Sequence, residues 1–343
     1  MVLWAGSTAV LHSRCLSREL TVGTPHCTRG IVLSESDVRT VPEWPALAKD
    51  AGLTTIGIHT GGGGQSGFLL RCIDFVKSPK GQTFLEQCDK LGLHVEYEIH
   101  AMEDLLPRQL FDTDPTMFRM DEEGQRIRKF NCCVHSGNAL EVICENTINF
   151  ARQCRPTTGR YFLWIDDGKY MCRCPKCRRF SDSEQALILE NRMLKTLRTI
   201  EKNASLAHLA YARTLQPPVR IKPDPGIFLE YAPIHRDYSI PYEKQGEEYQ
   251  DNLTMLDANL KVFPLESVQV LEYWTDVSKF SRWKRPYKKL PWRPDVFRAD
   301  VRIYKSKGIR HITAFGCGFD RDYFDRYGTP PIAEYGAGLQ VID

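Results

Sequence analysis

The sequence lacks any run of about 20 apolar residues, which is the length that a membrane-spanning helix needs. It also lacks an excess of charge of either sign, since 46 lysines and arginines face 43 aspartates and glutamates. That near-balance argues against a general polyanion-binding protein. We therefore expect neither a membrane nor a nucleic acid as a partner.

Cysteine is too sparse for a disulfide scaffold, because 12 cysteines are spread over 343 residues. The N-terminus carries no basic residue ahead of its first apolar residues, which is not the pattern of a secretory signal. A cytoplasmic protein with reduced thiols is therefore the default expectation. Secretion is the alternative if further residues precede this N-terminus.

A short apolar, strand-like segment followed by a helical pattern recurs along the chain. Such alternation is typical of a parallel sheet covered by helices. The eight strand-like segments are residues 30–36, 54–60, 93–102, 160–168, 206–213, 227–234, 268–276 and 310–320. Eight units predict a single (β/α)8 barrel, a TIM barrel, over residues 30–343, after an N-terminal extension of residues 1–29.

Two segments depart from a regular barrel. The link TLQPPVRIKPDPG (214–226) is too rich in proline for a full helix, and the tail (327–343) offers a short helix at best. A doubly wound sheet is the alternative fold, but no G-x-G-x-x-G pattern opens the first unit. We therefore expect a somewhat irregular α/β barrel.

Acidic and aromatic residues gather where the strands end, and a barrel carries its chemistry at the carboxyl ends of its strands. On the fourth strand the two-residue period places Trp164 and Asp166 on the inner face, with Asp167 as the first residue beyond it. Burying several carboxylates together is costly, and proteins accept that cost mainly at functional sites. A local salt bridge or a helix cap is the alternative for each acid.

Acids combined with aromatic rings suit a sugar, because carboxylates act at the glycosidic bond and rings stack on the sugar face. The candidate substrate-binding residues are His59, Glu98, His100, Trp164, Tyr231, Trp274, Trp283 and Asp320. Asp166 and Asp167 diverge as neighbours at a strand end, so they cannot flank one bond as acid and nucleophile. They could serve neighbouring atoms of a 2-acetamido sugar, whose own amide oxygen attacks the anomeric carbon.

Four long segments carry a resemblance to a known family: LWIDDGKYMCRCPKC, IFLEYAPIHRDY, LEYWTDVSKFSRWKRPYKKLPW and YGTPPIAEYGAGL. From about residue 30 onward the chain resembles glycoside hydrolase family 163, earlier catalogued as domain-of-unknown-function family 4838. The resemblance implies a (β/α)8 catalytic domain with endo-β-N-acetylglucosaminidase activity on N-glycans, by the substrate-assisted route. We expect a glycan or glycoprotein as the substrate and no cofactor for catalysis.

We assign roles to four carboxylates as a hypothesis. Asp166 orients the acetamido group, and Asp167 is the general acid/base. Glu230 is the rival for the acid/base role, and Glu272 is a ligand to sugar hydroxyls or a second rival. Two other functions stay open: a barrel glycosidase for a different sugar, and a non-enzymatic, zinc-braced protein that binds carbohydrate or nucleic acid.

Three cysteines, Cys172, Cys174 and Cys177, stand within six positions after the fourth strand. Three thiolates at this spacing can hold a structural zinc ion if a fourth ligand comes from elsewhere. The segment FNCCVHS supplies the candidates, which are Cys132, Cys133 and His135. Packed thiols without a metal, or a disulfide, are the alternatives. A catalytic zinc is disfavoured, because four protein ligands leave no open position.

Overall fold

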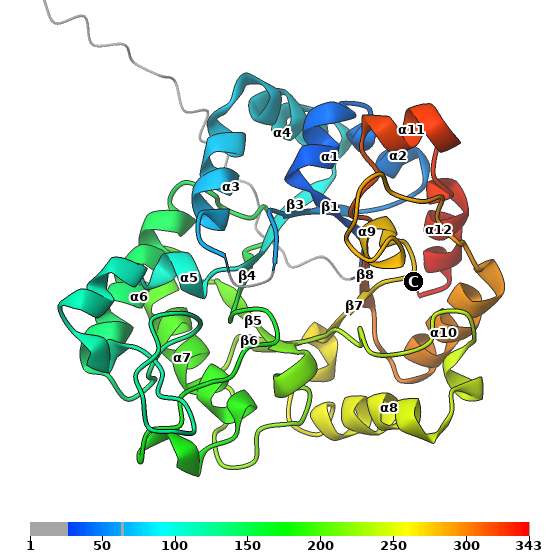
Figure 1. Cartoon of the computed structure of the whole chain (residues 1–343). Coiled ribbons are helices and arrows are strands. Elements are labelled where there is room, and N and C mark those ends of the chain that lie inside the picture. Colours follow the sequence, from blue (N-terminus) through cyan, green and yellow to red (C-terminus); the bar gives the residue numbers. More distant parts are fainter. Residues whose placement is uncertain (1–26, 63–64, 343) are drawn as a thin grey trace, which may run out of the picture.

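The computed structural model describes residues 27–62 and 65–342, where eight parallel strands close into one barrel (Figure 1). The strands are β1 (Thr28–Ser34), β2 (Thr55–His59), β3 (His94–His100), β4 (Arg160–Trp164), β5 (Ser205–Ala210), β6 (Ile227–Tyr231), β7 (Gln269–Glu272) and β8 (His311–Phe315). Each strand pairs with the next, and β8 returns to β1. The predicted barrel is confirmed. Most of the expected N-terminal extension, residues 1–26, lies outside the described residues.

The strands coincide with the eight predicted segments, but every one ends earlier than its pattern indicated. β4 ends at Trp164 and β7 at Glu272, each four residues before the predicted end. Beyond those points the backbone turns, so the alternation of inward and outward side chains no longer applies. This difference decides which side chains reach the candidate site.

Helices surround the barrel (Figure 1). They are α1 (Glu35–Thr40), α2 (Trp44–Asp50), α3 (Phe68–Lys77), α4 (Pro79–Leu91), α5 (Met102–Leu105), α6 (Gly137–Ala151), α7 (Asp182–Leu197), α8 (Glu247–Asn259), α9 (Val277–Phe280), α10 (Pro294–Ser306), α11 (Arg321–Tyr327) and α12 (Ile332–Leu339). Local sequence explains where the longer ones begin. Ser78 caps α4 by accepting a hydrogen bond from the Gly81 N–H, and Ser181 and Glu184 form a capping box at the start of α7.

Both expected irregularities are present. Between β5 and β6, a link that is described throughout, the chain forms only the short 3-10 turn Ala212–Thr214, as its prolines dictate. The tail forms α12, which packs against α2 and α10, and then a short 3-10 turn, Gln340–Ile342. From α12, the hydroxyl of Tyr335 donates to the Gly30 carbonyl at 2.6 Å. The last helix thereby holds the strand that begins the barrel.

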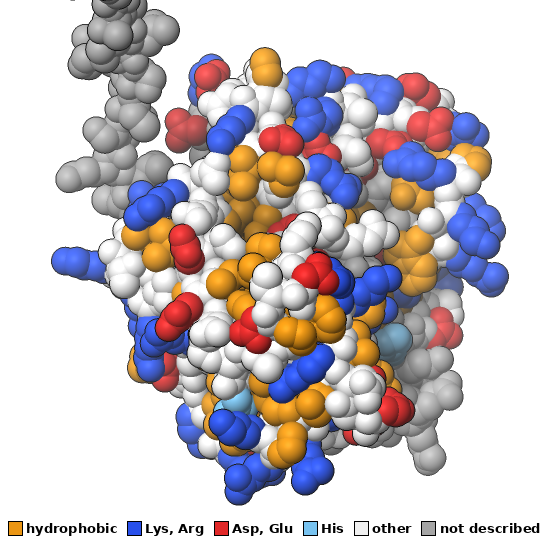
Figure 2. All heavy atoms as spheres, turned by 60° about the vertical axis from the view of Figure 1, so that its left-hand side comes forward, with side chains coloured by type: hydrophobic (Ala, Val, Ile, Leu, Met, Phe, Trp, Pro, Cys, Tyr) orange, Lys and Arg blue, Asp and Glu red, His pale blue; other side chains and the backbone are white. Residues whose placement is uncertain are grey.

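The described helices are each too short or too polar to cross a bilayer. On the face shown in Figure 2, lysine and arginine side chains are interspersed with aspartate and glutamate side chains. That mixture agrees with the near-balance of charge in the sequence.

Gly336 lies where α12 approaches α2. A Cβ at this position would stand 2.0 Å from the carbonyl oxygen of Ala51, a backbone atom that yields only if the helices move apart. We expect Gly336→Ala to lower the free energy of unfolding by about 1–3 kcal/mol, which is typical of overpacking. Chemical denaturation measures the change.

Gly137→Ala is the matched control, because a Cβ at that position in α6 would meet no atom within 4 Å. Its free energy of unfolding should stay the same or rise by less than about 1 kcal/mol. Equal stabilities of the two variants would contradict the close packing of α12.

Candidate active site

A cavity of about 570 Å³ opens at the carboxyl ends of the strands. Its walls combine residues from several strand ends: His59 from β2, Asp167 from the loop after β4, Tyr211 after β5, and Tyr273 and Asp276 after β7. The volume is in the range of small-ligand sites. The position is the one at which barrels of this kind carry their chemistry.

Five of the predicted site residues line the cavity, and they are His59, His100, Trp164, Asp167 and Trp283. These five residues are far apart in the chain and come together in one cavity. Trp283 stands at the rim and is 66% exposed, so its ring is available to a bound ligand. The other four belong to the interior of the cavity.

Aromatic rings form much of the cavity wall. The ring of Phe315 contacts those of Tyr273 and Trp164, with centroid distances of 5.3 and 6.4 Å, respectively. Tyr273 and Phe315 were not among the predicted residues, although each directly follows or ends an apolar strand. Flat apolar walls of this kind suit the carbon face of a sugar ring.

Asp167 is the predicted acid that reaches the cavity. It is partly exposed, and its Oδ1 accepts a hydrogen bond of 2.9 Å from the hydroxyl of Tyr211. Burial and the charge of Asp167 raise the pKa of Tyr211, so the phenol stays protonated and donates. Gly62 passes close on another side, because a Cβ there would lie 3.1 Å from Asp167 Oδ2.

Asp166, by contrast, turns away from the main cavity and is 1% exposed. Its Oδ1 accepts the backbone N–H of Glu103, and its Oδ2 accepts that of Asn131. Burial raises the pKa of Asp166 to about 6, although the Arg108 cation and these N–H groups oppose the rise. Because β4 already ends at Trp164, strand parity no longer directs this side chain inward, and Asp166 joins two loops instead.

Two histidines in the wall are held in one orientation. The Nδ1 atoms of His59 and His100 each lie 2.7 Å from a backbone carbonyl oxygen, of Glu98 and Ile165, respectively. Desolvation lowers the pKa of His59 to about 4, and it lowers the pKa of His100 as well. Both rings are therefore neutral at pH 7, with Nδ1–H donating to the carbonyl. Their Nε2 atoms are left as acceptors for ligand hydroxyls.

Glu98 and Glu230 lie inside the barrel beneath the cavity and are fully buried. Glu230 accepts a hydrogen bond of 2.7 Å from the indole N–H of Trp164. Burial raises the pKa of Glu230 to about 8, and burial together with the charge of Glu230 raises that of Glu98 further above its usual range. Gly57 makes room for this group, since a Cβ there would lie 2.6 Å from Glu98 Oε1. The two glutamates support the cavity floor and do not line it.

Glu272 and Trp274 face the helices. Glu272 accepts hydrogen bonds from the hydroxyls of Tyr304 and Tyr238 and forms an ion pair of 3.2 Å with Arg236. The indole N–H of Trp274 donates to a carboxylate of α10. The odd-numbered residues of β7 point into the barrel, and they include the cavity residue Leu271.

Two other predicted residues also lie outside the cavity lining. The hydroxyl of Tyr231 donates to the carbonyl of Asn252 in α8. Asp320 caps α11 by accepting the Tyr323 N–H at 3.1 Å, and it pairs with Arg285. Both therefore have structural partners outside the cavity lining.

Asp276 is a second cavity carboxylate that the sequence prediction missed. It is 5% exposed, and its Oδ1 accepts hydrogen bonds from Ser278 Oγ at 2.6 Å and from the Lys279 N–H at 3.0 Å. Burial raises its pKa. The sequence carried one local signal for Asp276, because an aspartate directly before a short helix is a typical N-cap. With Asp167, it gives the cavity two acids on different loops.

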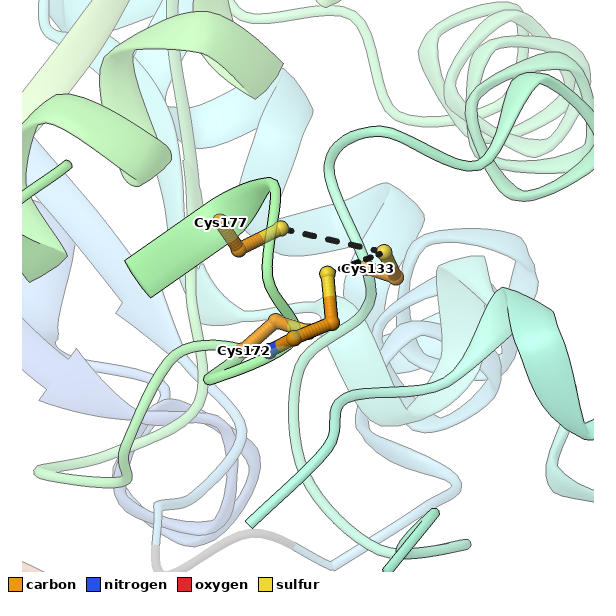
Figure 3. A group of neighbouring side chains, drawn as sticks. Cys133, Cys172 and Cys177 are labelled. Carbon is orange, nitrogen blue, oxygen red and sulfur yellow. Dashed lines mark hydrogen bonds between the residues drawn. The ribbon is translucent and has the colours of Figure 1, made fainter. Parts of the chain in front are cut away.

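Four cysteines meet beside the candidate site, and we name Cys133, Cys172, Cys174 and Cys177 the cysteine cluster. Their sulfur atoms all lie within 4.8 Å of one another, and all four side chains are buried. In Figure 3 the side chain of Cys133 comes from one loop, and those of Cys172 and Cys177 come from another and point toward it. Cys133 is thus the residue, among the three candidates, that completes the predicted set. A tetrathiolate cluster of this kind could hold a metal ion.

A family model described as a domain of unknown function, DUF4838, matches residues 74–315. No curated protein sequence matches the chain. The solved structures that are similar include a GH5-4 broad specificity endoglucanase from an uncultured bacterium. Its TM-score is 0.50 at 10% identity, over 89% of this chain and 86% of that one. An α-amylase from Lactobacillus plantarum has a TM-score of 0.51 at 11% identity, over 91% and 79%. At these identities the likeness concerns the fold alone.

The buried glutamates predict a pH dependence of stability. A carboxyl group whose pKa is raised by folding binds its proton more tightly in the folded state, so it destabilises the fold as the pH rises through the folded pKa. We expect the free energy of unfolding to fall between about pH 5 and pH 9, through the pKa of about 8 of Glu230. In Glu98→Gln this fall should be smaller, because one buried carboxyl and its repulsion are gone.

Denaturation midpoints at pH 5.5 and pH 9 measure this difference. Glu266→Gln serves as the control, since Glu266 is exposed and should keep the wild-type dependence. Identical pH profiles for Glu98→Gln and the wild type would refute the electrostatic assignment.

Proposed function

The chain belongs to the DUF4838 family, and from this premise we propose that it is a retaining glycoside hydrolase that cleaves β-linked N-acetylglucosamine in glycans. The observation that carries the proposal is the cavity, where Asp167 and Asp276 share walls with aromatic rings. The endoglucanase and the α-amylase of similar fold are named for glycan hydrolysis, which supports the reaction class and no finer assignment.

Asp167 is the general acid/base of the proposed reaction. It is the more exposed of the two cavity acids, and Tyr211 holds its Oδ1 by the hydrogen bond of 2.9 Å. In the first step the carboxyl group gives its proton to the glycosidic oxygen as the bond to the anomeric carbon breaks. In the second step the carboxylate removes a proton from the water that attacks the same carbon.

Asp276 orients the acetamido group in place of Asp166, which the sequence had suggested for this role. The acetamido oxygen attacks the anomeric carbon, and positive charge develops on the amide nitrogen. A buried carboxylate beside that N–H stabilises the charge. Oδ1 of Asp276 accepts the hydrogen bonds from Ser278 Oγ and the Lys279 N–H, so we assign Oδ2 to the substrate. Asp166 becomes a positioning residue for Asp167.

The remaining cavity groups bind the sugar. Trp164, Tyr273 and Phe315 provide apolar ring faces, and the neutral His59 and His100 provide acceptors for hydroxyl groups. No metal ion takes part in this chemistry, and the cysteine cluster does not line the cavity. Endo cleavage within N-glycans is the substrate range that the family resemblance implies, and it belongs to this proposal.

Glycan release from a complex N-glycoprotein, followed by mass spectrometry, tests the reaction. The wild type should leave one N-acetylglucosamine on the protein, and Asp167→Asn should lower the rate by about 10²–10⁴-fold, as loss of a general acid does. Asp322→Asn, a change at an exposed residue of α11, is the control with unchanged activity. No release by the folded wild type would favour another sugar or a binding protein.

The two aspartates can be told apart by the leaving group. A nitrophenyl leaving group departs without a proton, so Asp167→Asn should recover much of its first-step rate on a nitrophenyl glycoside, and Asp276→Asn should not. A thiazoline inhibitor that mimics the cyclised intermediate should bind more weakly to Asp276→Asn than to the wild type. Equal losses of activity in Asp167→Asn and Asp276→Asn, on both the glycoprotein and the nitrophenyl glycoside, would contradict the separate roles of the two aspartates. A wild type that the thiazoline does not inhibit would point to a different sugar.

A further inference from the structure

We propose that the cysteine cluster binds one structural zinc ion, which ties together the two loops behind the cavity. These are the β3 loop (residues 101–136), which carries Cys133, and the β4 loop (residues 165–181), which carries the other three cysteines. Four thiolates complete a tetrahedron and leave no position for a substrate, so the ion is structural. The inference does not rest on the proposed function.

The spacing of the sulfur atoms fits a tetrahedral site. With zinc–sulfur bonds of about 2.3 Å, the sulfur atoms of a tetrahedron stand about 3.8 Å apart. Cys133 Sγ lies 3.8 Å from Cys174 Sγ and 3.7 Å from Cys177 Sγ. A disulfide would require about 2.05 Å, so the four thiols are gathered for a common partner and not in bonded pairs.

Hydrogen-bond donors also surround the sulfur atoms. The backbone N–H groups of Met120 and Cys174 point to Cys172 Sγ at 3.3 and 3.4 Å. The Nδ1 of His135 lies 3.1 Å from Cys177 Sγ. Such donors stabilise thiolates bound to a metal and fix their directions. Cysteines that were simply packed in a core would not need them.

Positive charge stands beside the cluster as well. A zinc ion with four thiolates carries a net charge of −2, and burying that charge requires compensation. The guanidinium Nη1 of Arg126 lies 3.9 Å from Cys172 Sγ and also donates to the Phe118 carbonyl at 2.6 Å. The β3 loop thus contributes a ligand, N–H donors and a cation to the same site.

The proposed ion would brace the turn that carries Asp166 and Asp167. Asn131 stands two residues before Cys133, and its side-chain amide donates to the carbonyls of Lys169 and Tyr170 at 3.2 and 3.0 Å. Tyr170 stands two residues before Cys172. The zinc ion and the Asn131 contacts therefore fasten the same two loops at adjacent points.

Metal content tests the site directly. Wild-type protein reconstituted with Zn²⁺ and desalted should carry about one zinc per chain by elemental analysis. Reconstitution with Co²⁺ should give the near-ultraviolet thiolate-to-cobalt absorption of a tetrahedral site. Cys133→Ser and Cys177→Ser should lose most of both signals, and Cys27→Ser, whose side chain lies outside the cluster, should keep them. Wild-type protein stripped by a chelator and reloaded gives the same readout if a variant does not fold.

Backbone hydrogen exchange tests whether the metal ion stabilises the β3 and β4 loops. Removing the metal should speed backbone exchange in residues 129–134 and 166–172, with α4 unchanged as an internal reference. Folded wild type that takes up neither metal, wild type that purifies with iron, or Cys133→Ser that binds zinc like the wild type would overturn the zinc assignment. Unchanged exchange after metal loss would overturn the bracing role. None of these measurements uses a substrate, so they are independent of the proposed activity.

Discussion

The reciprocal hydrogen bonds between Asn131 and Asp166 are the interaction on which the candidate site depends. The N–H of Asp166 donates to Asn131 Oδ1 at 2.9 Å, and the N–H of Asn131 donates back to Asp166 Oδ2. Both residues are buried, so losing either bond would leave polar groups without water. Asn131 adopts a left-handed backbone with φ of 49°, which asparagine tolerates better than most residues. Since Asp167 follows directly, this pair sets the direction in which its carboxylate enters the cavity.

The barrel interior carries a second constraint, which is the cost of buried charge. Glu96, Glu98 and Glu230 lie within the barrel with Arg160, whose guanidinium stands 4.1 Å from the ring centre of Phe228. Apolar residues at these positions would make a more stable core. What the glutamates provide is placement, because Glu230 holds the indole of Trp164 that forms part of the cavity wall. The buried glutamates therefore lower the stability of the barrel beneath the site, which is common for functional regions.

Much of the fold followed from local pattern. Short apolar segments located all eight strands, and the structure shows serine caps at the starts of α4 and α7. The short helices α5, α9 and α11 carry too few residues to show a helical period, and they were not anticipated. The ends of the strands were placed too late for a similar reason: the same apolar residues continue past the last ladder hydrogen bond, where hydrophobicity alone no longer marks a strand.

The sequence by itself determined the barrel, the candidate acid Asp167 and three of the four clustered cysteines, because each depends on residues that are near in the chain. Only the tertiary structure decided that Asp276, and not Glu272, faces the cavity. That outcome depends on where β7 ends and on which of its side chains point into the barrel. It also selected Cys133 as the fourth thiol, from a position 41 residues before Cys174. Such meetings of distant segments are set by packing between loops, and a local pattern cannot encode them.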